Sequence, residues 1–537
     1  MSALLEISDL SIALPKSADR RFAVESLSLS IGQGETVCIV GESGSGKTMS
    51  AHAVMGLLPK TTRVVGGVVR LAGADIPVAD PVLMRGIRGR DIGMIFQEPM
   101  TSLNPLMRID EQLSEVFRAH GDVPADIRKR ILDLFEEMGL PDPVKIARSF
   151  PHQLSGGQRQ RVMIAMALAL NPKLLIADEP TTALDVTTQA QILSLISRLQ
   201  RDHGTSVMFI THDFGVVREI ADRVVVLRHG VAVEQGAADQ VLGAPQHQYS
   251  KELIAAVPSL VPPAPRPIAQ MPPLLAVKNL RKTFGHPGIA GKGRVVHAVN
   301  DVSLDIRGGE TLGIVGESGS GKSTTARCIV RLMEPEAGEV LVDGTSFLSL
   351  RGKELRDQRR RVQIIFQDPF ASLNPRRPVG RIIAEGPEAQ GVARREAERR
   401  ARELLAIVGL PEQAFDRYPH EFSGGQRQRI GIARAIAMNP DVLIADEAVS
   451  ALDVSVQAKI LELLKDLQAR LGLAILFVTH DLRVAAQICD RIGVMQQGRM
   501  VELQPTAQLF ANPRHEYTRQ LLASVPGNAR VVRPATV

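Results

Sequence analysis

The chain carries the same set of short motifs twice, and this internal repeat constrains its fold more than any other feature. The glycine-rich segment at residues 41–48 (GESGSGKT) returns 275 positions later at residues 316–323 as GESGSGKS. Ile95–Pro99 returns 270 positions later as Ile365–Pro369. Four further segments return 268 positions later, and they begin at Ser155 (SGGQ), Asp178 (DE), Ala183 (ALD) and Thr211 (THD). The repeat predicts two domains of one fold, with small insertions or deletions confined to the early part of each copy.

A proline-rich segment separates the two copies. It runs from Val261 to Pro267 as VPPAPRP and ends in Met271–Pro273 (MPP), a composition that suits a semi-rigid spacer and neither a helix nor a central strand. We therefore expect a first domain at 1–258, a linker at 259–273, a second domain at 274–527 and a tail at 528–537. Each copy has about 255 residues, enough for its own hydrophobic core.

Short apolar runs precede each chemical motif, which predicts α/β domains with largely parallel sheets. The runs are Val37–Val40, Leu174–Ala177 and Val207–Ile210 in the first copy, and Leu312–Val315, Val442–Ala445 and Ile475–Val478 in the second. Between the Gln97 and Ser155 regions, apolar residues from Ile127 to Met138 fall on one helical face and Gly139 follows as a C-cap. The second copy has a counterpart that ends at Gly409. We interpret both stretches as a helical subdomain inserted into the core.

Composition excludes several classes of protein. The 64 basic and 58 acidic residues give a net charge of only +6, which favours a mixed solvated surface over a nucleic-acid site. Cys38, Cys328 and Cys489 lie far apart, which argues against a disulfide framework, a zinc site or a cluster site. The N-terminus does not resemble a signal peptide, and no run of about 18 apolar residues occurs. If the protein works on a membrane, other chains must supply the channel.

The glycine-rich segments match the full GxxxxGK[ST] pattern. In such a loop, backbone N–H groups wrap phosphates at a helix N-terminus, the lysine neutralises the β and γ phosphates, and the hydroxyl binds Mg²⁺. A chance pair of glycine-rich turns is the alternative, and the doubled strand–loop context disfavours it. The candidate ATP-binding residues are Gly41, Ser43, Gly44, Gly46, Lys47 and Thr48, and Gly316, Ser318, Gly319, Gly321, Lys322 and Ser323.

An acidic pair ends a predicted strand in each copy. Asp178 and Asp446 would hold Mg²⁺ directly or through water, and the following Glu179 and Glu447 would polarise the attacking water. For an isolated Asp-Glu pair, a solvated strand end is the better interpretation. The repeat of the whole motif set favours the catalytic one here.

Two neutral residue types complete each set. Gln97 and Gln367 can contact the metal or the attacking water through their amides, and His212 and His480 can hydrogen-bond the γ phosphate. A lone glutamine or histidine is usually an ordinary polar residue. These four gain weight only because they recur with the other motifs.

The motif that defines the class is Leu154–Gln160 (LSGGQRQ), repeated as Phe422–Gln428 (FSGGQRQ). A serine and two glycines that open a helix form a second anion-binding surface. Together with the other motifs, over nearly the whole chain, this segment resembles the ATP-binding-cassette (ABC) family. The resemblance implies two tandem P-loop ABC ATPase domains, each a RecA-like core with an antiparallel β subdomain and a helical subdomain.

In that family the signature motif of one domain closes over the nucleotide of the other. Carried over, Ser423 and Gly425 would complete the site of Lys47, and Ser155 and Gly157 would complete the site of Lys322. Dimerisation would then be an intramolecular pairing of the two domains. Because neither site lacks a main catalytic residue, we expect both to hydrolyse ATP.

The resemblance also implies an aromatic residue stacked on adenine. Phe284 fits this role in the second domain, whereas the aligned residue of the first domain is Leu14. Phe22 is an alternative there, and the choice stays open.

Two further pairs of segments resemble the dipeptide, oligopeptide, nickel and glutathione importer branch of the family. The fusion of two cassettes in one chain is similar to the microcin C and oligopeptide type. They are Pro99–Pro105 with Pro369–Pro375, and Pro245–Leu253 with Pro513–Leu521. This implies an ATPase subunit that energises import of peptides or related small solutes, peripheral on the cytoplasmic face of the inner membrane. Its partners would be two integral-membrane permease subunits and, through them, an extracytoplasmic solute-binding protein. The Pro-x-His-x-Tyr segments could also be no more than closing helices packed on their own domains.

The alternative function is a soluble tandem-ABC factor that acts on ribosomes. Such factors have a long charged helical linker, whereas this linker is short and proline-rich. A DNA-repair cassette protein is disfavoured because its zinc-binding cysteine clusters are missing.

Overall fold

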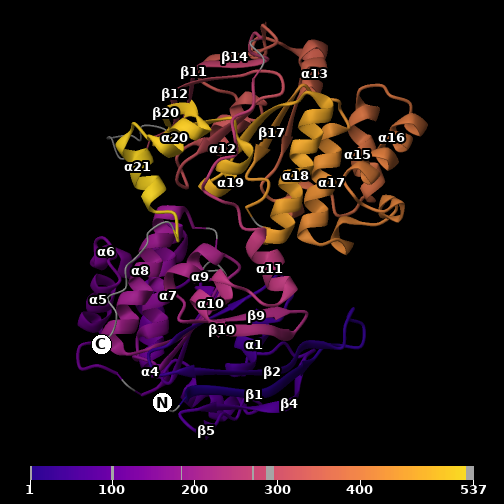
Figure 1. Cartoon of the computed structure of the whole chain (residues 1–537). Helices are drawn as coiled ribbons and strands as arrows, with labels where there is room; N and C mark the ends of the chain where they lie inside the picture. Colours follow the sequence, from indigo (N-terminus) through magenta and orange to yellow (C-terminus); the bar gives the residue numbers. More distant parts are fainter. Residues whose placement is uncertain are drawn as a thin grey trace. The chain divides into compact units, whose positions relative to one another are not determined.

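The computed structural model describes residues 3–97, 102–121, 123–182, 184–268, 271–285, 295–450 and 452–527. The chain forms two compact units, Met1–Ala256 with Pro526–Val537, and Val257–Val525 (Figure 1). Within the predicted motifs, residues 98–101, Ala183, Ala451 and the tail at 528–537 lie outside the described residues.

Two sheets form the first unit. The smaller sheet is antiparallel and has the strand order β2-β1-β4-β5. The larger sheet has six strands in the order β10-β9-β3-β8-β7-β6. In the larger sheet β9, β3, β8, β7 and β6 run parallel and β10 is antiparallel. The strands are β1 Ala3–Ala13, β2 Phe22–Gly32, β3 Thr36–Val40, β4 Arg63–Leu71, β5 Ala74–Asp75, β6 Ile92–Ile95, β7 Leu174–Asp178, β8 Ser206–Ile210, β9 Arg223–Arg228 and β10 Val231–Ala237.

Several helices of the first unit begin at a polar N-cap residue. Asp185 accepts a hydrogen bond from the Thr188 amide at the start of the long helix α8, as an N-cap should. Helices α4 to α7 form the helical subdomain, and α5 lies over the predicted apolar stretch and ends just before Gly139. The helices are α1 Lys47–Val54, α2 Pro81–Ile87, α4 Ile109–Ala119, α5 Ile127–Glu137, α6 Pro143–Ala147, η1 Pro151–Gln153, α7 Gly156–Leu168, α8 Val186–His203, α9 Phe214–Ile220, α10 Ala238–Gly243 and α11 Gln248–Ala255.

The second unit repeats this arrangement. Its sheets have the orders β12-β11-β14-β15 and β16-β17-β18-β13-β19-β20. The strands are β11 Leu275–Phe284, β12 Val296–Ile306, β13 Thr311–Val315, β14 Ala337–Val342, β15 Thr345–Ser346, β16 Val362–Ile365, β17 Val442–Asp446, β18 Ala474–Val478, β19 Arg491–Gln496 and β20 Arg499–Pro505.

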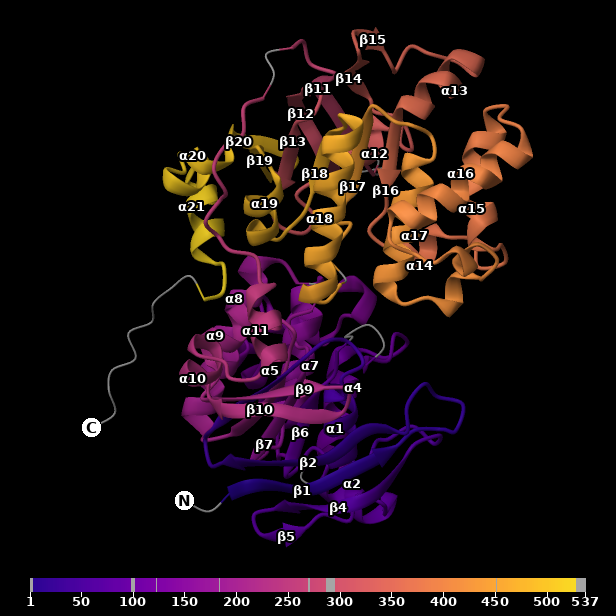
Figure 2. The same cartoon turned by 45° about the vertical axis from the view of Figure 1, so that its right-hand side comes forward.

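Its helical subdomain, α14 to α17, gathers on the β16 side of the sheet (Figure 2). The helices are α12 Lys322–Ile329, α13 Gly352–Arg361, α14 Pro369–Ser372, α15 Val379–Ala389, α16 Arg394–Ile407, η3 Glu412–Phe415, η4 Pro419–Glu421, α17 Gly424–Ile436, α18 Val454–Leu471, α19 Leu482–Ile488, α20 Thr506–Ala511 and α21 Glu516–Ala523.

The core of each unit lies between its two sheets and the helix after the glycine-rich loop. Strands β3, β7, β8, β13, β17 and β18 are buried at every position, as expected for parallel strands covered on both faces. Apolar side chains of both sheets and of α1 or α12 form one continuous cluster in each unit. The predicted α/β fold, with an antiparallel β subdomain and a helical subdomain in each half, is confirmed.

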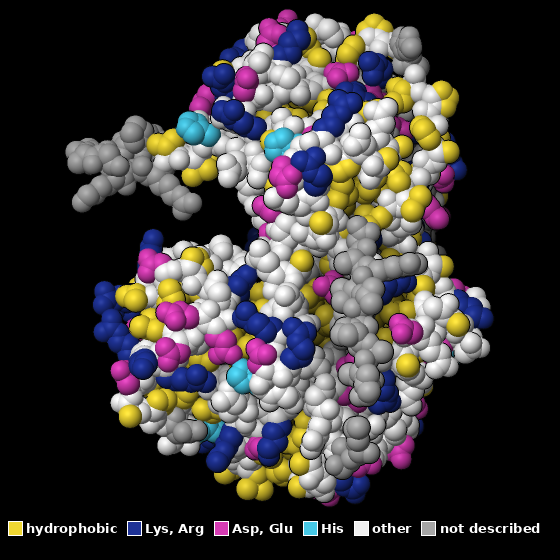
Figure 3. Space-filling model, turned by 60° about the vertical axis from the view of Figure 1, so that its left-hand side comes forward, with side chains coloured by type: hydrophobic (Ala, Val, Ile, Leu, Met, Phe, Trp, Pro, Cys, Tyr) yellow, Lys and Arg dark blue, Asp and Glu magenta, His cyan; other side chains and the backbone are white. Residues whose placement is uncertain are grey.

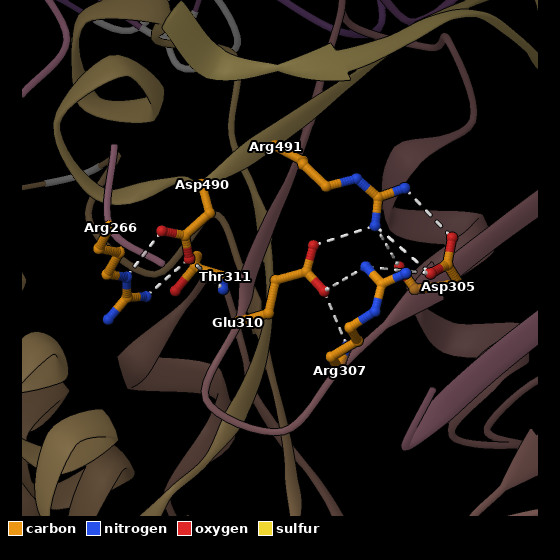
Figure 4. A network of polar contacts seen from close by, with 7 residues as sticks. All are labelled: Arg266, Asp305, Arg307, Glu310, Thr311, Asp490 and Arg491. Carbon is orange, nitrogen blue, oxygen red and sulfur yellow. Dashed lines mark hydrogen bonds and ion pairs between the residues drawn. The ribbon is translucent and has the colours of Figure 1, made fainter. Parts of the chain in front are cut away.

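The proline-rich linker packs against the second unit. Arg266 donates to both carboxylate oxygens of Asp490 at 2.7 Å and to Gln468 Oε1 at 2.7 Å. Figure 4 shows this pair beside a second ion-pair group, in which Arg491 contacts Asp305 and Glu310. The described linker residues, 259–268 and 271–273, contain no helix or strand, in keeping with the composition. Its attachment through Arg266 was not evident from the sequence.

Charges of both signs are scattered over the face of the molecule that Figure 3 shows. On the face shown in Figure 3, basic and acidic side chains lie interspersed over both units. Among the described residues, no helix is both long enough and apolar enough to cross a lipid bilayer.

Candidate functional site

Two positions in each glycine-rich loop have room only for glycine. Gly41 has φ 150°, and a Cβ there would lie 2.2 Å from the carbonyl oxygen of Leu227; at Gly46 (φ 104°) it would lie 2.5 Å from that of Ala23. Gly316 and Gly321 repeat both features, with carbonyl oxygens at 2.2 and 2.0 Å. Each loop leads into the N-terminus of a helix, so its backbone N–H groups and the helix dipole suit a bound phosphate.

The loop lysines are buried and held by the loops themselves. Lys47 Nζ donates to the carbonyl oxygens of Gly41 and Glu42, each at 2.8 Å, and Lys322 Nζ repeats both bonds with Gly316 and Glu317 at the same distances. These bonds fix each ammonium group inside the curve of its loop. The positive charge is therefore in place for a polyphosphate.

A hydroxyl at the start of α1 or α12 meets the aspartate that ends β7 or β17. Thr48 Oγ1 donates to Asp178 Oδ1 at 3.1 Å, and Ser323 Oγ donates to Asp446 Oδ1 at 2.7 Å. Burial raises the pKa of Asp178 to about 6, against the lowering effect of the Thr48 hydrogen bond, and burial also raises the pKa of Asp446.

The oxygen ligands of this pair fit a magnesium ion. Asp446 Oδ2 is buried and accepts no hydrogen bond from any residue that the structure describes. Hydroxyl and carboxylate oxygens are the donors that Mg²⁺ prefers, and a bound cation would offset the cost of burying the carboxylates.

The glutamate after each aspartate is the centre of a polar cluster. Glu179 accepts from Gln97 Nε2 at 3.0 Å and from Thr182 Oγ1 at 3.0 Å, and its Oε1 lies 3.2 Å from Nδ1 of His212. Burial would raise the pKa of Glu179, but the hydrogen bond and charge of His212, with Thr182 and Lys47, lower it to about 2. The pKa of His212 is raised because Glu179 outweighs the effect of burial. The predicted Gln, Glu and His thus lie together in the first unit.

The second unit has the same glutamine, glutamate and histidine with somewhat different contacts. Gln367 Nε2 donates to Glu447 Oε2 at 2.8 Å, and His480 Nδ1 lies 3.5 Å from that oxygen. Ser450, the counterpart of Thr182, donates to the backbone carbonyl of Glu447 at 3.0 Å and not to its carboxylate. Contact with His480 holds the pKa of Glu447 below its usual range in spite of burial. The sequence change after the glutamate alters the cluster without removing its members.

Both glutamates adopt a strained backbone conformation. Glu179 has φ 47° and Glu447 has φ 49°, values that residues with a Cβ rarely adopt. Backbone bonds from the Glu179 amide to Ile210 O and from the Glu447 amide to Val478 O, both 2.9 Å, hold this geometry. Such strain is typical of functional sites, where surrounding contacts maintain it.

The signature motifs open helices α7 and α17. Ser155 is the N-cap of α7, and its Oγ accepts from the Gln158 amide at 3.2 Å; Ser423 repeats the bond with Gln426 at 3.4 Å. A Cβ on Gly157 would lie 2.8 Å from Thr188 Cγ2. On Gly425 it would lie 2.3 Å from Val456 Cγ1. These glycines therefore also allow close packing of the signature helix on the next one, a role that the motif alone did not indicate.

The candidate adenine platform differs between the units. Phe284 ends β11 with 39% of its surface exposed, and Lys282 Nζ lies 5.7 Å from its ring. The strand pairing places Leu14 at the matching point of the first unit. Phe22 lies on the neighbouring strand opposite Ala13, with the Arg21 guanidinium 5.0 Å from its ring. In the first unit the candidate ring thus comes from β2, the neighbouring strand, and not from the end of β1.

Three further contacts with the glycine-rich loops escaped sequence reasoning. Arg20 Nη2 donates to the carbonyl oxygen of Gly44. The hydroxyl groups of Tyr249 and Tyr517 reach the loops from the Pro-x-His-x-Tyr segments. The recurrence of those segments was a usable signal for the tyrosines, but the sequence could not tell that they reach the loops. Arg20 has no repeated counterpart and gave no signal.

Comparison with known proteins identifies the family. The sequence profile of the family described as ABC transporter matches residues 24–182 and 299–450, and that of the oligopeptide/dipeptide transporter C-terminal region matches residues 233–284 and 501–535. The chain belongs to the ATP-binding-cassette transporter family, and it is an ATP-binding ATPase.

Curated relatives extend the match over nearly the whole chain. The glutathione import ATP-binding proteins GsiA of Pectobacterium atrosepticum and of Escherichia coli strain K12 are 46% and 48% identical to it, over 97% of this chain and 89% of each relative. A solved structure, the dimeric ATP-binding cassette MJ0796 bound to ADP and Pi, is 33% identical over 43% of this chain and 98% of its own, with a TM-score of 0.39. The relatives favour the transporter interpretation over the ribosome-factor alternative.

Proposed function

We propose that the chain powers import of glutathione or related peptide solutes by hydrolysing ATP at two sites. The observation that carries this proposal is the similarity, over 97% of the chain, to proteins named for glutathione import. The two complete sets of loop, aspartate, glutamate, glutamine and histidine support it. We also propose the domain limits predicted from the repeat, 1–258 and 274–527, with the linker at 259–273.

We propose Mg²⁺ as the partner of ATP at both sites. Thr48 and Asp178, with Gln97, would hold it in the first cassette, and Ser323, Asp446 and Gln367 in the second. The ion would neutralise phosphate charge and raise the electrophilicity of the γ phosphorus. Lys47 and Lys322 would add a fixed positive charge on the loop side.

The glutamates would orient the attacking water. At neutral pH a carboxylate with a pKa of about 2, as for Glu179, is fully ionised and accepts a hydrogen bond from water without taking its proton early. Gln97 and His212 both contact the Glu179 carboxylate in this structure. When nucleotide binds, one of them would have to leave the carboxylate and contact the γ phosphate instead. The same exchange would occur between Gln367, Glu447 and His480.

We propose that the two cassettes pair within one chain. Ser423 and Gly425 would contact the nucleotide held by Lys47, and Ser155 and Gly157 the one held by Lys322. The completeness of the signature motif in both halves supports this arrangement. A short linker raises the local concentration of each partner to about the millimolar range.

The partners we propose are two integral-membrane permease subunits and, through them, an extracytoplasmic solute-binding protein, with the chain peripheral on the cytoplasmic face of the inner membrane. A difference between the helical subdomains supports two unlike permease contacts. The first has a pocket of about 230 Å³ whose lining includes Arg108, Ile131 and Arg148. In the second, Phe415 packs so closely on α15 that a Cβ at Gly380 would lie 2.4 Å from its ring.

Turnover by catalytic variants tests the ATPase part of the proposal. Glu179→Gln keeps the shape of the side chain and removes its charge, so we expect partial turnover from the other site and almost none in Glu179→Gln/Glu447→Gln. Undiminished turnover in the single variant would remove Glu179 from its role.

Uptake tests the transport part. Cells that lack the gene should lose uptake of labelled glutathione or peptides and regain it with the wild-type chain but not with the double glutamine variant. Co-purification with integral-membrane permeases supports the importer. ATP-dependent co-sedimentation with ribosomes would contradict it.

A further inference from the structure

Each Pro-x-His-x-Tyr segment places a tyrosine hydroxyl on a phosphate-binding loop. Tyr249, in the first turn of α11, accepts a hydrogen bond from the Glu42 amide at 3.2 Å. Tyr517, in the first turn of α21, accepts one from the Glu317 amide at 3.1 Å. The partners lie 207 and 200 positions apart in the chain. The same long-range contact therefore occurs independently in both cassettes.

A strand carboxylate, half-buried in the first cassette and buried in the second, orients each tyrosine helix. Glu234 accepts from the amides of Gln246 and His247 at 2.7 and 3.1 Å, and His247 Nδ1 accepts from the Tyr249 amide at 3.1 Å. These bonds fix the chain just before α11 to β10 and cap the helix.

The second cassette repeats the arrangement. Glu502 accepts from the amides of Arg514 and His515 at 2.8 and 3.0 Å, and His515 Nδ1 accepts from the Tyr517 amide at 3.2 Å. The helix entry is thus built identically around each tyrosine, which limits the directions that its ring can take.

The rings are also fixed by burial. Tyr249 and Tyr517 are 4% and 5% exposed. The Arg228 guanidinium lies 4.8 Å from the Tyr249 ring, and burial raises the pKa of Tyr249 to about 12, so the hydroxyl stays protonated. Each hydroxyl is held at one place against its loop.

The tyrosine and the loop lysine bind opposite ends of one peptide group. The Glu42 N–H, which donates to Tyr249, belongs to the same peptide plane as the Gly41 carbonyl, which accepts from Lys47. In the second cassette the Glu317 N–H and the Gly316 carbonyl form the matching pair. Hydrogen bonds at both ends of a peptide group polarise it and resist its rotation. The orientation of this group therefore bears on the position of the lysine ammonium, which donates to its carbonyl oxygen and to the next one along the loop.

We propose that Tyr249 and Tyr517 are positioning residues that set the conformation of the phosphate-binding loops, and so the affinity of each cassette for nucleoside triphosphate. This inference rests on the proposed nucleotide sites. It assigns to the Pro-x-His-x-Tyr segments a part in nucleotide binding, beyond the packing of a closing helix.

The chain contains its own control for the test. It has three tyrosines and no tryptophan, and the third tyrosine, Tyr418, is 39% exposed. The first cassette has Phe150 at the position that matches Tyr418, so Tyr418→Phe changes the residue to one that the repeat already tolerates. Tyr249→Phe and Tyr517→Phe remove one hydroxyl each and keep the ring.

The experiment measures ATP hydrolysis by the full-length chain in the presence of Mg²⁺. We expect the KM of Tyr249→Phe/Tyr517→Phe to rise about 3- to 10-fold, the size of one lost hydrogen bond, with kcat within about twofold of wild type. Tyr418→Phe should match wild type in both constants, and the melting temperatures of all variants should agree. Should a variant fold poorly, the two single variants give the same readout one site at a time.

Intrinsic tyrosine fluorescence supplies a second readout, because no tryptophan masks it. A non-hydrolysable ATP analogue should change the emission of wild type and of Tyr418→Phe, whereas the double variant, which retains only Tyr418, should not respond. A full response from the double variant, or a wild-type KM in it, would overturn the inference alone. A wild-type chain that neither binds nor hydrolyses ATP would overturn the proposed function as well.

Discussion

Gly425 tests whether the signature glycines serve packing as well as the proposed binding of nucleotide. A Cβ at this position would lie 2.3 Å from Cγ1 and 3.5 Å from Cβ of Val456 on helix α18. Val456 is β-branched and cannot rotate its methyl groups away freely, so helix α17 must move or the side chain must leave its rotamer. Overpacking of this kind costs about 1–3 kcal/mol. We expect Gly425→Ala to destabilise the second cassette by that amount even without nucleotide.

A matched control lies on the same helix. A Cβ at Gly431 would meet nothing within 4 Å, and Gly431 has no positive φ. Gly431→Ala should therefore stabilise the chain by about 0.5–1 kcal/mol through the better helix propensity of alanine. In the double variant Gly425→Ala/Val456→Ala the clash is gone. The remaining loss of stability should be the one caused by shortening Val456 to alanine.

Calorimetry of the full-length chain without nucleotide measures these effects. For a unit of this size 1 kcal/mol shifts the melting temperature by about 2–4 °C, so Gly425→Ala should lower one transition and Gly431→Ala should raise it slightly. If Gly425→Ala melts like the wild type while ATP hydrolysis falls, the glycine serves the nucleotide only and the packing argument is wrong.

Two further predictions concern polar contacts of the second unit. Burial alone would raise the pKa of Glu502, but hydrogen bonds from the Thr518 hydroxyl and neighbouring amides outweigh burial, and the net pKa is lowered. The ionised Glu502 therefore contributes its full stability above the unfolded pKa of about 4.3, and this contribution is lost as the pH falls further. The protection factors of the α21 amides, which correct for the intrinsic pH dependence of exchange, should fall below about pH 4 in the wild type and be low already at neutral pH in Glu502→Gln. Arg266→Ala should release the linker from Asp490 and speed hydrogen exchange at residues 259–268 several-fold, whereas Arg281→Ala, which removes an exposed surface pair, should leave that segment unchanged. Equal exchange in both arginine variants would mean that Arg266 does not hold the linker.

Much of the fold and of the site was predictable because the repeat marks it. Parallel strands of apolar residues that end in Asp178 or lead to Lys47 leave few other topologies, and the carboxyl ends of such strands must meet at one edge. The gathering of Gln97, Glu179 and His212 follows from that geometry. Their individual hydrogen bonds do not follow, because the sequence gives the ends of strands but not side-chain rotamers.

What the sequence did not reveal are contacts between distant segments that share no periodicity. The Tyr249 hydroxyl reaches Glu42 only because β10 and α11 turn back over the loop, and no local pattern encodes that path. The grip of Arg266 on Asp490 is equally invisible in a proline-rich composition. The signature motif did not indicate the steric reason for a glycine at position 157, because the side chain that it packs against, Thr188, lies on another helix.

The two cassettes are alike in most of the residues proposed to bind nucleotide and unlike in the residues behind them. Arg327 Nε lies 4.0 Å from Asp446 Oδ2, whereas the first cassette has His52 at the matching position, and burial lowers the pKa of His52. A guanidinium keeps its charge at all physiological pH values, so only the second aspartate has a permanent positive neighbour on that side. The sites should therefore differ in how strongly they hold a divalent cation, because the Arg327 charge, which opposes the effect of burial on the pKa of Asp446, would also repel the ion. Equal motifs thus do not imply equal sites. The differences lie in residues outside the motifs, such as Arg327 and His52, which a motif search does not include.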